Sequence, residues 1–316
     1  MRVAPQALAR SAARRLGLQR SDITAAVPVP DRAVPPYVLN AVCHPDFWDD
    51  PEWMQVQRTL ELLPGDDQWH RKRFEWTQCI YGLERLGVLG PHATVLGVGA
   101  GHERVLFYLA NRSALTVATD LYTGAFTDSP AAEADPDFVR NPEHFAPFPY
   151  RRDRLAVLRA DGTRLPFQDN GFDVVYSLSS IEHFGGHDAA TVAMREMARV
   201  LKPGGVCCVA TELVLQGGEH PEFFTPEALQ HHVVEESGMV PVERLHQAPL
   251  PQSMLDDPIW LDGDLYRMPH LVLGRDQHRW TSVVLFLRKP SNAQLALHAA
   301  PRVAARALRN LARRDR

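Results

Sequence analysis

Short apolar runs alternate with helically patterned segments through the middle of the chain. Residues 102–112 and 188–201 carry apolar side chains at the spacing of a helix that buries one face. The runs that predict strands are 93–98, 114–120, 155–161, 172–178 and 205–213. Strands that are apolar nearly throughout and separated by helices are typical of a parallel sheet covered on both faces. The pattern therefore predicts a doubly wound α/β fold.

Further elements flank this core. Apolar residues recur at helical spacing over 69–86, and Gly87 ends that run. Asp188 is expected to cap the helix that follows the fourth strand, and Thr225 with a proline after it predicts another helix start. Residues 279–290 form one more apolar run and predict a late strand.

The length of 316 residues allows about two units, or one large α/β unit with extensions. We expect the extended form. Its parts are a basic, proline-rich tail (1–35), a helical extension (36–90), the α/β domain (91–290) and a basic tail (291–316). Two segments, 121–153 and 246–278, do not fit the alternation and are expected to be inserted functional loops near strand ends.

Charge is distributed unevenly along the chain. The net charge is −4, yet residues 1–20 and 301–316 each carry a net +5, so the body between them is acidic. An acidic body argues against a nucleic-acid partner. The basic C-terminal tail has the composition of an amphipathic helix on an anionic membrane surface, or of a partly disordered tail.

Cysteine content and hydropathy indicate the compartment. Four scattered cysteines are too few to staple a chain of this size, which predicts a reducing environment. No apolar run reaches the ~20 residues that a membrane span needs, and no signal-peptide pattern opens the chain. A cytoplasmic protein with peripheral membrane contact through its tails is the expectation.

A glycine-rich turn follows the first predicted strand. Gly97, Gly99 and Gly101 let the backbone approach a ligand, and the helix after them presents unpaired N–H groups. A tight turn with no ligand is the alternative. The spacing is not the GxGxxG of a dinucleotide site, which disfavours an NAD-dependent oxidoreductase. Asp120 ends the second predicted strand, where a carboxylate can accept both ribose hydroxyls or can cap a helix.

Four motifs together resemble a known family. VLGVGAGHE, VATD, RADGTRLPFQDNGFDVVYSLSSIEHF and LKPGG occur in the order of Rossmann-like S-adenosylmethionine-dependent methyltransferases, over about residues 90–240. The resemblance implies a seven-stranded sheet whose last strand is antiparallel, here 279–290. It also implies S-adenosylmethionine (SAM) as cofactor and a small molecule or a glycan as substrate.

The resemblance further implies a set of site residues. In similar enzymes Asp161 would bind the adenine amino group, Asp120 the ribose, and the turn glycines the methionine part, while Ser177 and Leu178 would line the transfer cleft. The residues expected at the cofactor are Gly97, Gly99, Gly101, Glu103, Asp120, Leu121, Asp161, Gly162, Thr163, Ser177 and Leu178.

One position departs from the family. The resembling proteins usually carry an acid where this chain has Gly97, and a glycine where it has Glu103. Glu103 stands at a predicted helix start, where the dipole favours a carboxylate, and could reach the cofactor's ammonium group. Alternatively, Glu103 only caps its own helix.

Candidate bases follow the fourth predicted strand. His183 would lie at the carboxyl edge of the sheet with an ordinary pKa suited to general-base work, or it is structural. His187 and His220 are weaker candidates, and the adjacent pair His231 and His232 points apart on a helix, so no metal site is expected.

Two other groups of residues have functional and structural readings. The insert aromatics could roof a substrate pocket or simply pack the loops; they are Phe145, Phe148, Tyr150, Trp260 and Tyr266. The run Arg71, Lys72 and Arg73 precedes a helix that could close over the cofactor, though a charge run is usually a solvated face.

These observations predict a cytoplasmic SAM-dependent methyltransferase that acts on a small molecule or a glycan. A non-catalytic cofactor-binding or scaffold protein of the same fold is the alternative from another class, favoured by Gly97 and opposed by Asp120 and Asp161. A nucleic-acid methyltransferase is the weaker enzymatic alternative, because the body has no basic groove with interleaved aromatics.

Overall fold

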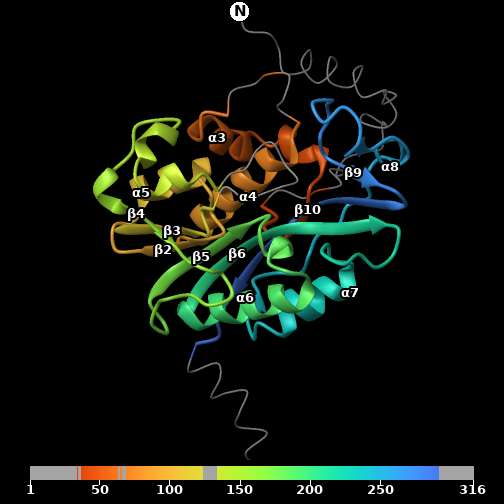
Figure 1. Ribbon diagram of the computed structural model, residues 1–316. Coiled ribbons are helices and arrows are strands. Elements are labelled where there is room, and N and C mark those ends of the chain that lie inside the picture. The colour runs from red at the N-terminus through yellow and green to blue at the C-terminus, as the bar shows by residue number, and fades with distance from the viewer. Residues whose placement is uncertain (1–33, 35–36, 63–64, 66–68, 124–133, 292–316) are drawn as a thin grey trace, which may run out of the picture.

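The computed structural model describes residues 34, 37–62, 65, 69–123 and 134–291. These residues form one ten-stranded sheet with helices on both faces (Figure 1). The longer strands are β2 (Thr94–Val98), β3 (Leu115–Asp120), β4 (Leu155–Arg159), β5 (Phe172–Leu178), β6 (Leu201–Gln216) and β10 (His278–Arg288). The short ones are β1 (Ala41–Val42), β7 (Val240–Pro241), β8 (Ile259–Trp260) and β9 (Leu273–Arg275). Apart from Val34 and Ser291, the two basic tails predicted from the sequence lie outside the described residues.

Strand order confirms the doubly wound fold. The strands run β4-β3-β2-β5-β6-β10-β9-β8, with β1 and β7 also pairing with β10. The pairs from β4 to β6 are parallel, and β10 is antiparallel to β6, as expected for the late strand. The expected count of seven strands is wrong, because β1 comes from the N-terminal extension and β8 and β9 come from the second insert. These strands have two or three residues, too few to show an alternating pattern.

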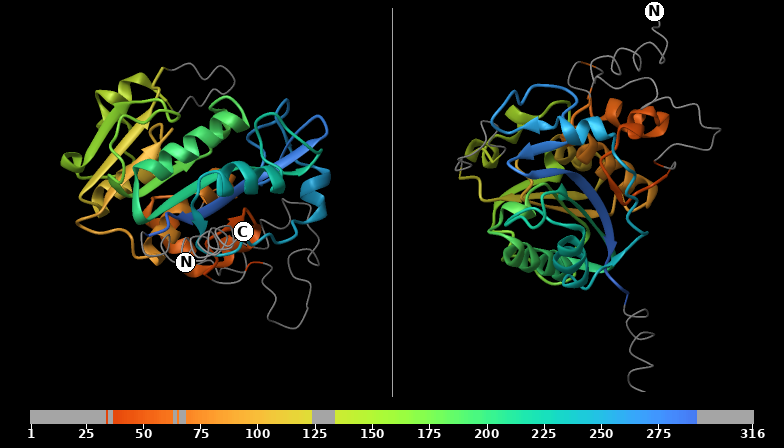
Figure 2. Two further views of the ribbon diagram at one scale, coloured as in Figure 1. Left: turned by 90° about the horizontal axis from the view of Figure 1, so that it is seen from below. Right: turned by 90° about the vertical axis from the view of Figure 1, so that its right-hand side faces the viewer.

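Helices cover the two faces of the sheet and close two apolar cores. The helices are α3 (Pro51–Thr59), α4 (Arg71–Arg85), α5 (Arg104–Arg112), α6 (His187–Val200), α7 (Pro226–Ala228) and α8 (Gln252–Asp256). Figure 1 shows α3, α4 and α5 on one side of the sheet and α6 with α7 on the other, and Figure 2 shows the same layers from two further directions. A π-helical segment η6 (Leu229–Glu235) continues α7.

Local signals explain where these helices begin. His70 caps α4 by accepting the N–H of Lys72, and Thr225 caps α7 as expected by accepting the N–H of Ala228 at 3.2 Å. The expectation that Asp188 caps α6 is wrong. Gly186 takes the capping position with a φ of 87°, a left-handed conformation that favours glycine, and Asp188 lies in the first turn.

The N-terminal extension is fixed to the sheet by close packing. A Cβ on Gly82 of α4 would lie 2.1 Å from the ring of Phe286 on β10, so glycine lets the helix approach the strand. Trp53 of α3 donates its indole N–H to Gln78 of α4 at 2.9 Å.

Both predicted inserts form short elements in their described parts. The first contains the 3-10 turns η2 (Pro136–Val139), η3 (Pro142–Phe145) and η4 (Arg152–Arg154), and the second contains α8, β8 and β9. Two more 3-10 turns lie elsewhere, η1 (Pro45–Asp49) in the extension and η5 (Ile181–His183) after β5.

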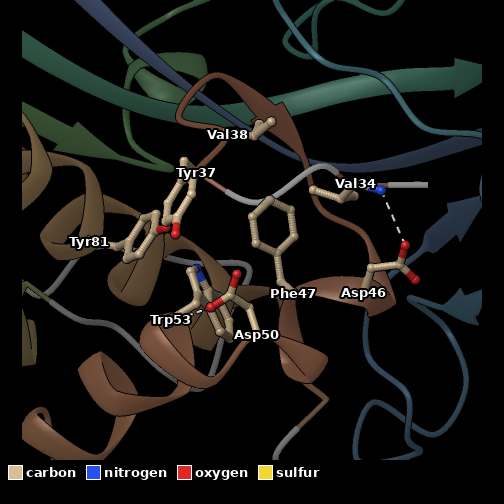
Figure 3. A pocket seen from close by; sticks show the side chains of 8 residues that line it. All are labelled: Val34, Tyr37, Val38, Asp46, Phe47, Asp50, Trp53 and Tyr81. Atoms are coloured by element: carbon tan, nitrogen blue, oxygen red, sulfur yellow. Dashed lines mark hydrogen bonds between the residues drawn. The ribbon is translucent and has the colours of Figure 1, made fainter. Parts of the chain in front are cut away.

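A small cavity lies between the extension and α4. Phe47, Asp50 and Trp53 line it with Tyr37 and Tyr81, as Figure 3 shows. Its volume of about 10 Å³ is close to the minimum that holds one water molecule. This cavity is therefore a packing gap and is too small for an organic ligand.

Candidate functional site

The turn after β2 has the backbone conformation that a close approach of a ligand requires. Gly99 and Gly101 have φ values of 62° and 47°, in the left-handed region that favours glycine. Asp120, at the end of β3, accepts the N–H of Gly101 at 3.0 Å. Tyr122 donates its hydroxyl to the carbonyl of Gly101 at 2.8 Å. Residues at the end of β3 thus bond to both the N–H and the carbonyl of Gly101 and fix the turn.

The two aspartates singled out from the sequence come together at the sheet edge. Asp120 pairs with Arg159 in the β3–β4 register, and the N–H of Ala160 donates to the carbonyl of Asp120 at 3.0 Å, so Asp161 follows directly beside it. Asp120 caps no described helix, because its carboxylate accepts the N–H groups of Gly101 and Leu121. The side chain of Leu121 beside it is exposed.

Asp161 opens an exposed loop after β4. Its Oδ1 accepts the N–H and the hydroxyl of Thr163 at 2.8 and 2.7 Å. Its Oδ2 has no hydrogen-bond donor among the residues that the structure describes, and the side chain reaches solvent. This oxygen is available to an amino group of a ligand.

The structure gives a physical reason for the glycine at position 97. A Cβ there would lie 2.8 Å from the hydroxyl oxygen of Tyr176 and 2.8 Å from Cβ of Ala100. Tyr176 is fully buried, and this burial raises the pKa of its hydroxyl. The ring of Tyr176 therefore fills the space that an acidic side chain at position 97 would need.

Glu103 is buried and does not act as a side-chain cap. It takes the N-cap position of α5, yet its carboxylate accepts no hydrogen bond from that helix. Instead Oε1 accepts the indole N–H of Trp76 on α4 at 3.2 Å. Burial raises the pKa of the Tyr176 and Tyr122 hydroxyls, and the negative charge of Glu103 raises it further. The capping alternative is wrong for the side chain, and the carboxylate acts electrostatically on the tyrosine that packs beside Gly97.

The segment after β5 packs against two of the predicted glycines. Ser180 donates its hydroxyl to the carbonyl of Gly99 at 2.7 Å, and a Cβ on Gly99 would lie 2.6 Å from its Cβ. A Cβ on Gly162 would lie 2.5 Å from the ring of Phe184. Ser177 and Leu178, the last residues of β5, are buried at the same end of the sheet. Glycine at these positions serves close packing of the chain around the site.

His183 lies in η5 with its side chain 33% exposed. Its Nδ1 is 3.6 Å from Oε2 of Glu222, and burial lowers its pKa. His187 and His220 lie farther along, His187 against the carbonyl of Phe223 and His220 stacked on the ring of Phe223. Both line an open groove that also includes His231 and His232. No group of three metal-ligating side chains in the described part of the chain is arranged to hold a metal ion.

A cluster of buried charges at the carboxyl ends of β5 and β6 was missed in the sequence. We call it the carboxylate cluster; it consists of Glu75, Glu182, Glu212, Arg71 and Lys72. Arg71 contacts Glu212 and lies 3.1 Å from Oε1 of Glu75, and Lys72 lies 3.1 Å from Oε2 of Glu75. The expectation that this basic run is a solvated face is wrong, because its first two side chains turn inward against acids.

Burial and neighbouring charges shift the pKa values of the carboxylates in this cluster. Burial raises the pKa of Glu182 to about 7. Burial also raises the pKa of Glu212, and the negative charges of Glu182 and Glu75 raise it further. In contrast, Lys72 and Arg71 hold the pKa of Glu75 below its ordinary value against the effect of burial. An acid within the apolar run of β6 was the one sequence signal that could have drawn attention to this cluster.

The aromatic residues of the inserts mostly pack. Phe145 lies 4.8 Å from the ring of His102, and Tyr150 lies 4.9 Å from the ring of Phe107 on α5. In the second insert Trp260 stacks under Arg279, while Tyr266 is 88% exposed. Phe148 packs against the apolar core on the α5 side.

Comparison with known proteins agrees with this geometry. Residues 96–209 match the family described as a methyltransferase domain. The chain is 34% identical over 141 residues to methyltransferase GfsG of Streptomyces halstedii, which covers 45% of this chain and 44% of that protein. It is also 34% identical over 149 residues to a demethylmenaquinone methyltransferase of Corynebacterium glutamicum, covering 46% and 49%. The matched part spans about half the length of these relatives.

A solved structure is similar over a larger share of the chain. The structure of geranyl diphosphate methyltransferase in complex with SAM has a TM-score of 0.46 at 16% identity, covering 80% of this chain and 97% of that one. No helix within the described residues has both the length and the apolar composition for crossing a membrane. Over residues 96–209, the chain is therefore similar to the family described as a methyltransferase domain.

Proposed function

We propose that the protein transfers a methyl group from SAM to a small molecule. The observation that carries this proposal is the meeting of the glycine turn, Asp120 and Asp161 at one edge of the sheet. This edge lies where strand order reverses about β2, with β3 on one side and β5 on the other. Ligands of open α/β sheets bind in the crevice at such a reversal.

The residues present fit SAM. Asp161 offers a solvent-facing oxygen for the adenine amino group, with Gly162 and Thr163 beside it. Asp120 accepts two backbone N–H groups, and a carboxylate has further lone pairs for ribose hydroxyls. Glu103 supplies the buried negative charge for the ammonium group, in the place of the acid that Tyr176 excludes from position 97.

These residues and the cofactor would have different roles in the transfer. When bound, SAM supplies the activated methyl group, and the protein supplies position and exclusion of water. Ser177 and Leu178 are proposed to line the transfer cleft where β5 ends. Orientation of the two reactants can account for ~7 to 11 kcal/mol of the barrier.

A small-molecule acceptor has the better support. A demethylmenaquinone methyltransferase, whose name gives a small-molecule acceptor, is matched over 149 residues, whereas a probable tRNA methyltransferase 9B of Mus musculus is matched over 49 residues. The acidic body of the chain agrees with this choice. A glycan acceptor is the second form of the same proposal.

A turnover assay tests this function. The purified protein would be incubated with SAM and separate pools of alcohols, phenols, amines and glycans, and S-adenosylhomocysteine (SAH) would be measured by mass spectrometry. We expect SAH to form with at least one pool, and Glu103→Gln to weaken SAM binding several-fold without lowering the melting temperature. SAM binding with no turnover in any pool would instead favour the non-catalytic alternative.

A further inference from the structure

The carboxylate cluster contains one acid without a cationic partner. Glu75 has Arg71 and Lys72 within 3.1 Å, and Glu212 contacts Arg71. Glu182 is fully buried, and no Lys, Arg or His nitrogen of the described chain lies within ion-pair distance of its carboxylate. Three acids thus share two permanent cations, and Glu182 is the one left over.

Glu182 also has unused hydrogen-bonding capacity. Its Oε2 accepts the hydroxyl of Thr211 at 2.9 Å, while its Oε1 is buried with no hydrogen-bond partner among the described residues. Oε2 of Glu212 is likewise buried with no hydrogen-bond partner among the described residues. A buried carboxylate oxygen without a donor is costly, so such an atom indicates that a proton or a ligand group completes the site.

The position of Glu182 relates it to the proposed cofactor site. It follows β5 by four residues, in the loop whose Ser180 bonds to Gly99 of the glycine turn. α4 reaches both the glycine turn and the carboxylate cluster. Its Trp76 donates to Glu103 beside the turn, and its Glu75, in the cluster, accepts the hydroxyl of Ser282 on β10 at 2.5 Å. The carboxylate cluster therefore lies next to the glycine turn, one strand over.

We propose that Glu182, rather than His183, takes the proton of the acceptor, and that the acceptor is accordingly a hydroxyl group of an alcohol or a phenol. This proposal rests on the proposed function. The acceptor oxygen bonds to the methyl carbon, the bond from that carbon to sulfur breaks with the electron pair left on sulfur, and the hydroxyl proton passes to Glu182. The products are a methyl ether, SAH and a neutral glutamic acid.

Other groups near Glu182 fit this role. The charges that act on it are Glu75, Arg71 and Lys72 of α4 and Glu212 of β6, and His183 of η5 is its neighbour in the chain. Burial raises the pKa of Glu182 to about 7, where a carboxyl group can both hold and accept a proton. Because Glu182 is fully buried, an acceptor reaches it only when the side chains that cover it move.

The proposal is testable without knowledge of the acceptor. SAM carries a positive sulfonium and SAH does not, so SAM should lower the pKa of a nearby Glu182 and release a proton that SAH leaves in place. A fall of one unit from about 7 releases on the order of 0.4 proton per site at pH 7. Titration calorimetry of SAM and of SAH in buffers with different ionisation enthalpies measures this difference.

We expect the difference in wild type and in Glu222→Gln, a matched change at a half-exposed acid near His183, and its loss in Glu182→Gln. Thr211→Val serves as a second variant. It removes the hydroxyl bonded to Oε2, and should move the pH of maximal proton release upward. Release that persists in Glu182→Gln and disappears in His183→Asn would overturn the proposal.

Activity supplies a second readout. We expect turnover with hydroxyl acceptors, and Glu182→Gln to lower kcat, with SAM affinity falling only by the several-fold that loss of the coupled charge implies. Turnover with amines or thiols alone would overturn the proposal but not the proposed function. Absence of SAM binding in wild type would overturn the proposed function itself.

Discussion

Glu182→Gln should change how stability depends on pH. In wild type, burial raises the pKa of Glu182 from 4.5 to about 7. The folded state therefore holds a proton that the unfolded state has released between these values, so this group's contribution to stability is complete below pH 4.5 and is lost as pH rises through 7. Glutamine keeps an acceptor for the hydroxyl of Thr211 and has no charge to bury.

The magnitude follows from these two pKa values. Between pH 5.5 and pH 8.5, wild type should lose about 2 kcal/mol of unfolding free energy through Glu182 alone. Glutamine at this position also removes repulsion that raises the pKa of Glu212, which adds a change of the same sign. The free-energy difference between variant and wild type should thus shift by about 2 kcal/mol in favour of the variant as pH rises.

Urea denaturation at the two pH values measures this difference, and groups common to both proteins cancel. Glu222→Gln is the control, because a side chain 49% exposed stays in contact with water and should give little shift. A difference for Glu182→Gln that stays the same at both pH values, within about 0.5 kcal/mol, would refute the idea that Glu182 is a buried proton carrier.

Two glycines give further predictions. Gly82→Ala should lower the unfolding free energy by about 1 to 3 kcal/mol because its Cβ would meet the ring of Phe286, whereas Gly90→Ala, with open space around it, should change it by less than about 1 kcal/mol. Denaturant unfolding compares the two, and equal effects would contradict the close packing of α4. Gly162→Ala should displace Phe184 and weaken SAH binding several-fold in calorimetry, and unchanged affinity would show that this contact lies away from the ligand.

The sheet was predictable because its central strands are local features. Each is a short apolar run, and β2, β3 and β5 begin and end within about one residue of the prediction. Asp120 and Asp161 could be named because each directly follows such a run. The four shortest strands could not be found, since two or three residues carry no period and their pairing is decided by distant partners.

The carboxylate cluster could not be assembled from the sequence for a related reason. Arg71 and Glu212 are 141 positions apart, and the sequence pattern does not show that α4 rests on the end of β6. A charge run is most often solvated, so Arg71 and Lys72 gave no sign of their burial. The reason for glycine at position 97 could not be predicted either. The ring that leaves no space for an acid there belongs to Tyr176, on a strand that is distant in the sequence.

SAH binding to Asp120→Ala combined with Asp161→Ala tests the central claim most directly. Calorimetry on wild type should show binding with one site per chain, and the double variant should lose at least ten-fold in affinity while still unfolding cooperatively. The two carboxylates accept hydrogen bonds at adjacent strand ends, so both would contact the adenosine part of the ligand. Equal affinity in wild type and in the folded double variant, or no binding by wild type, would contradict the account.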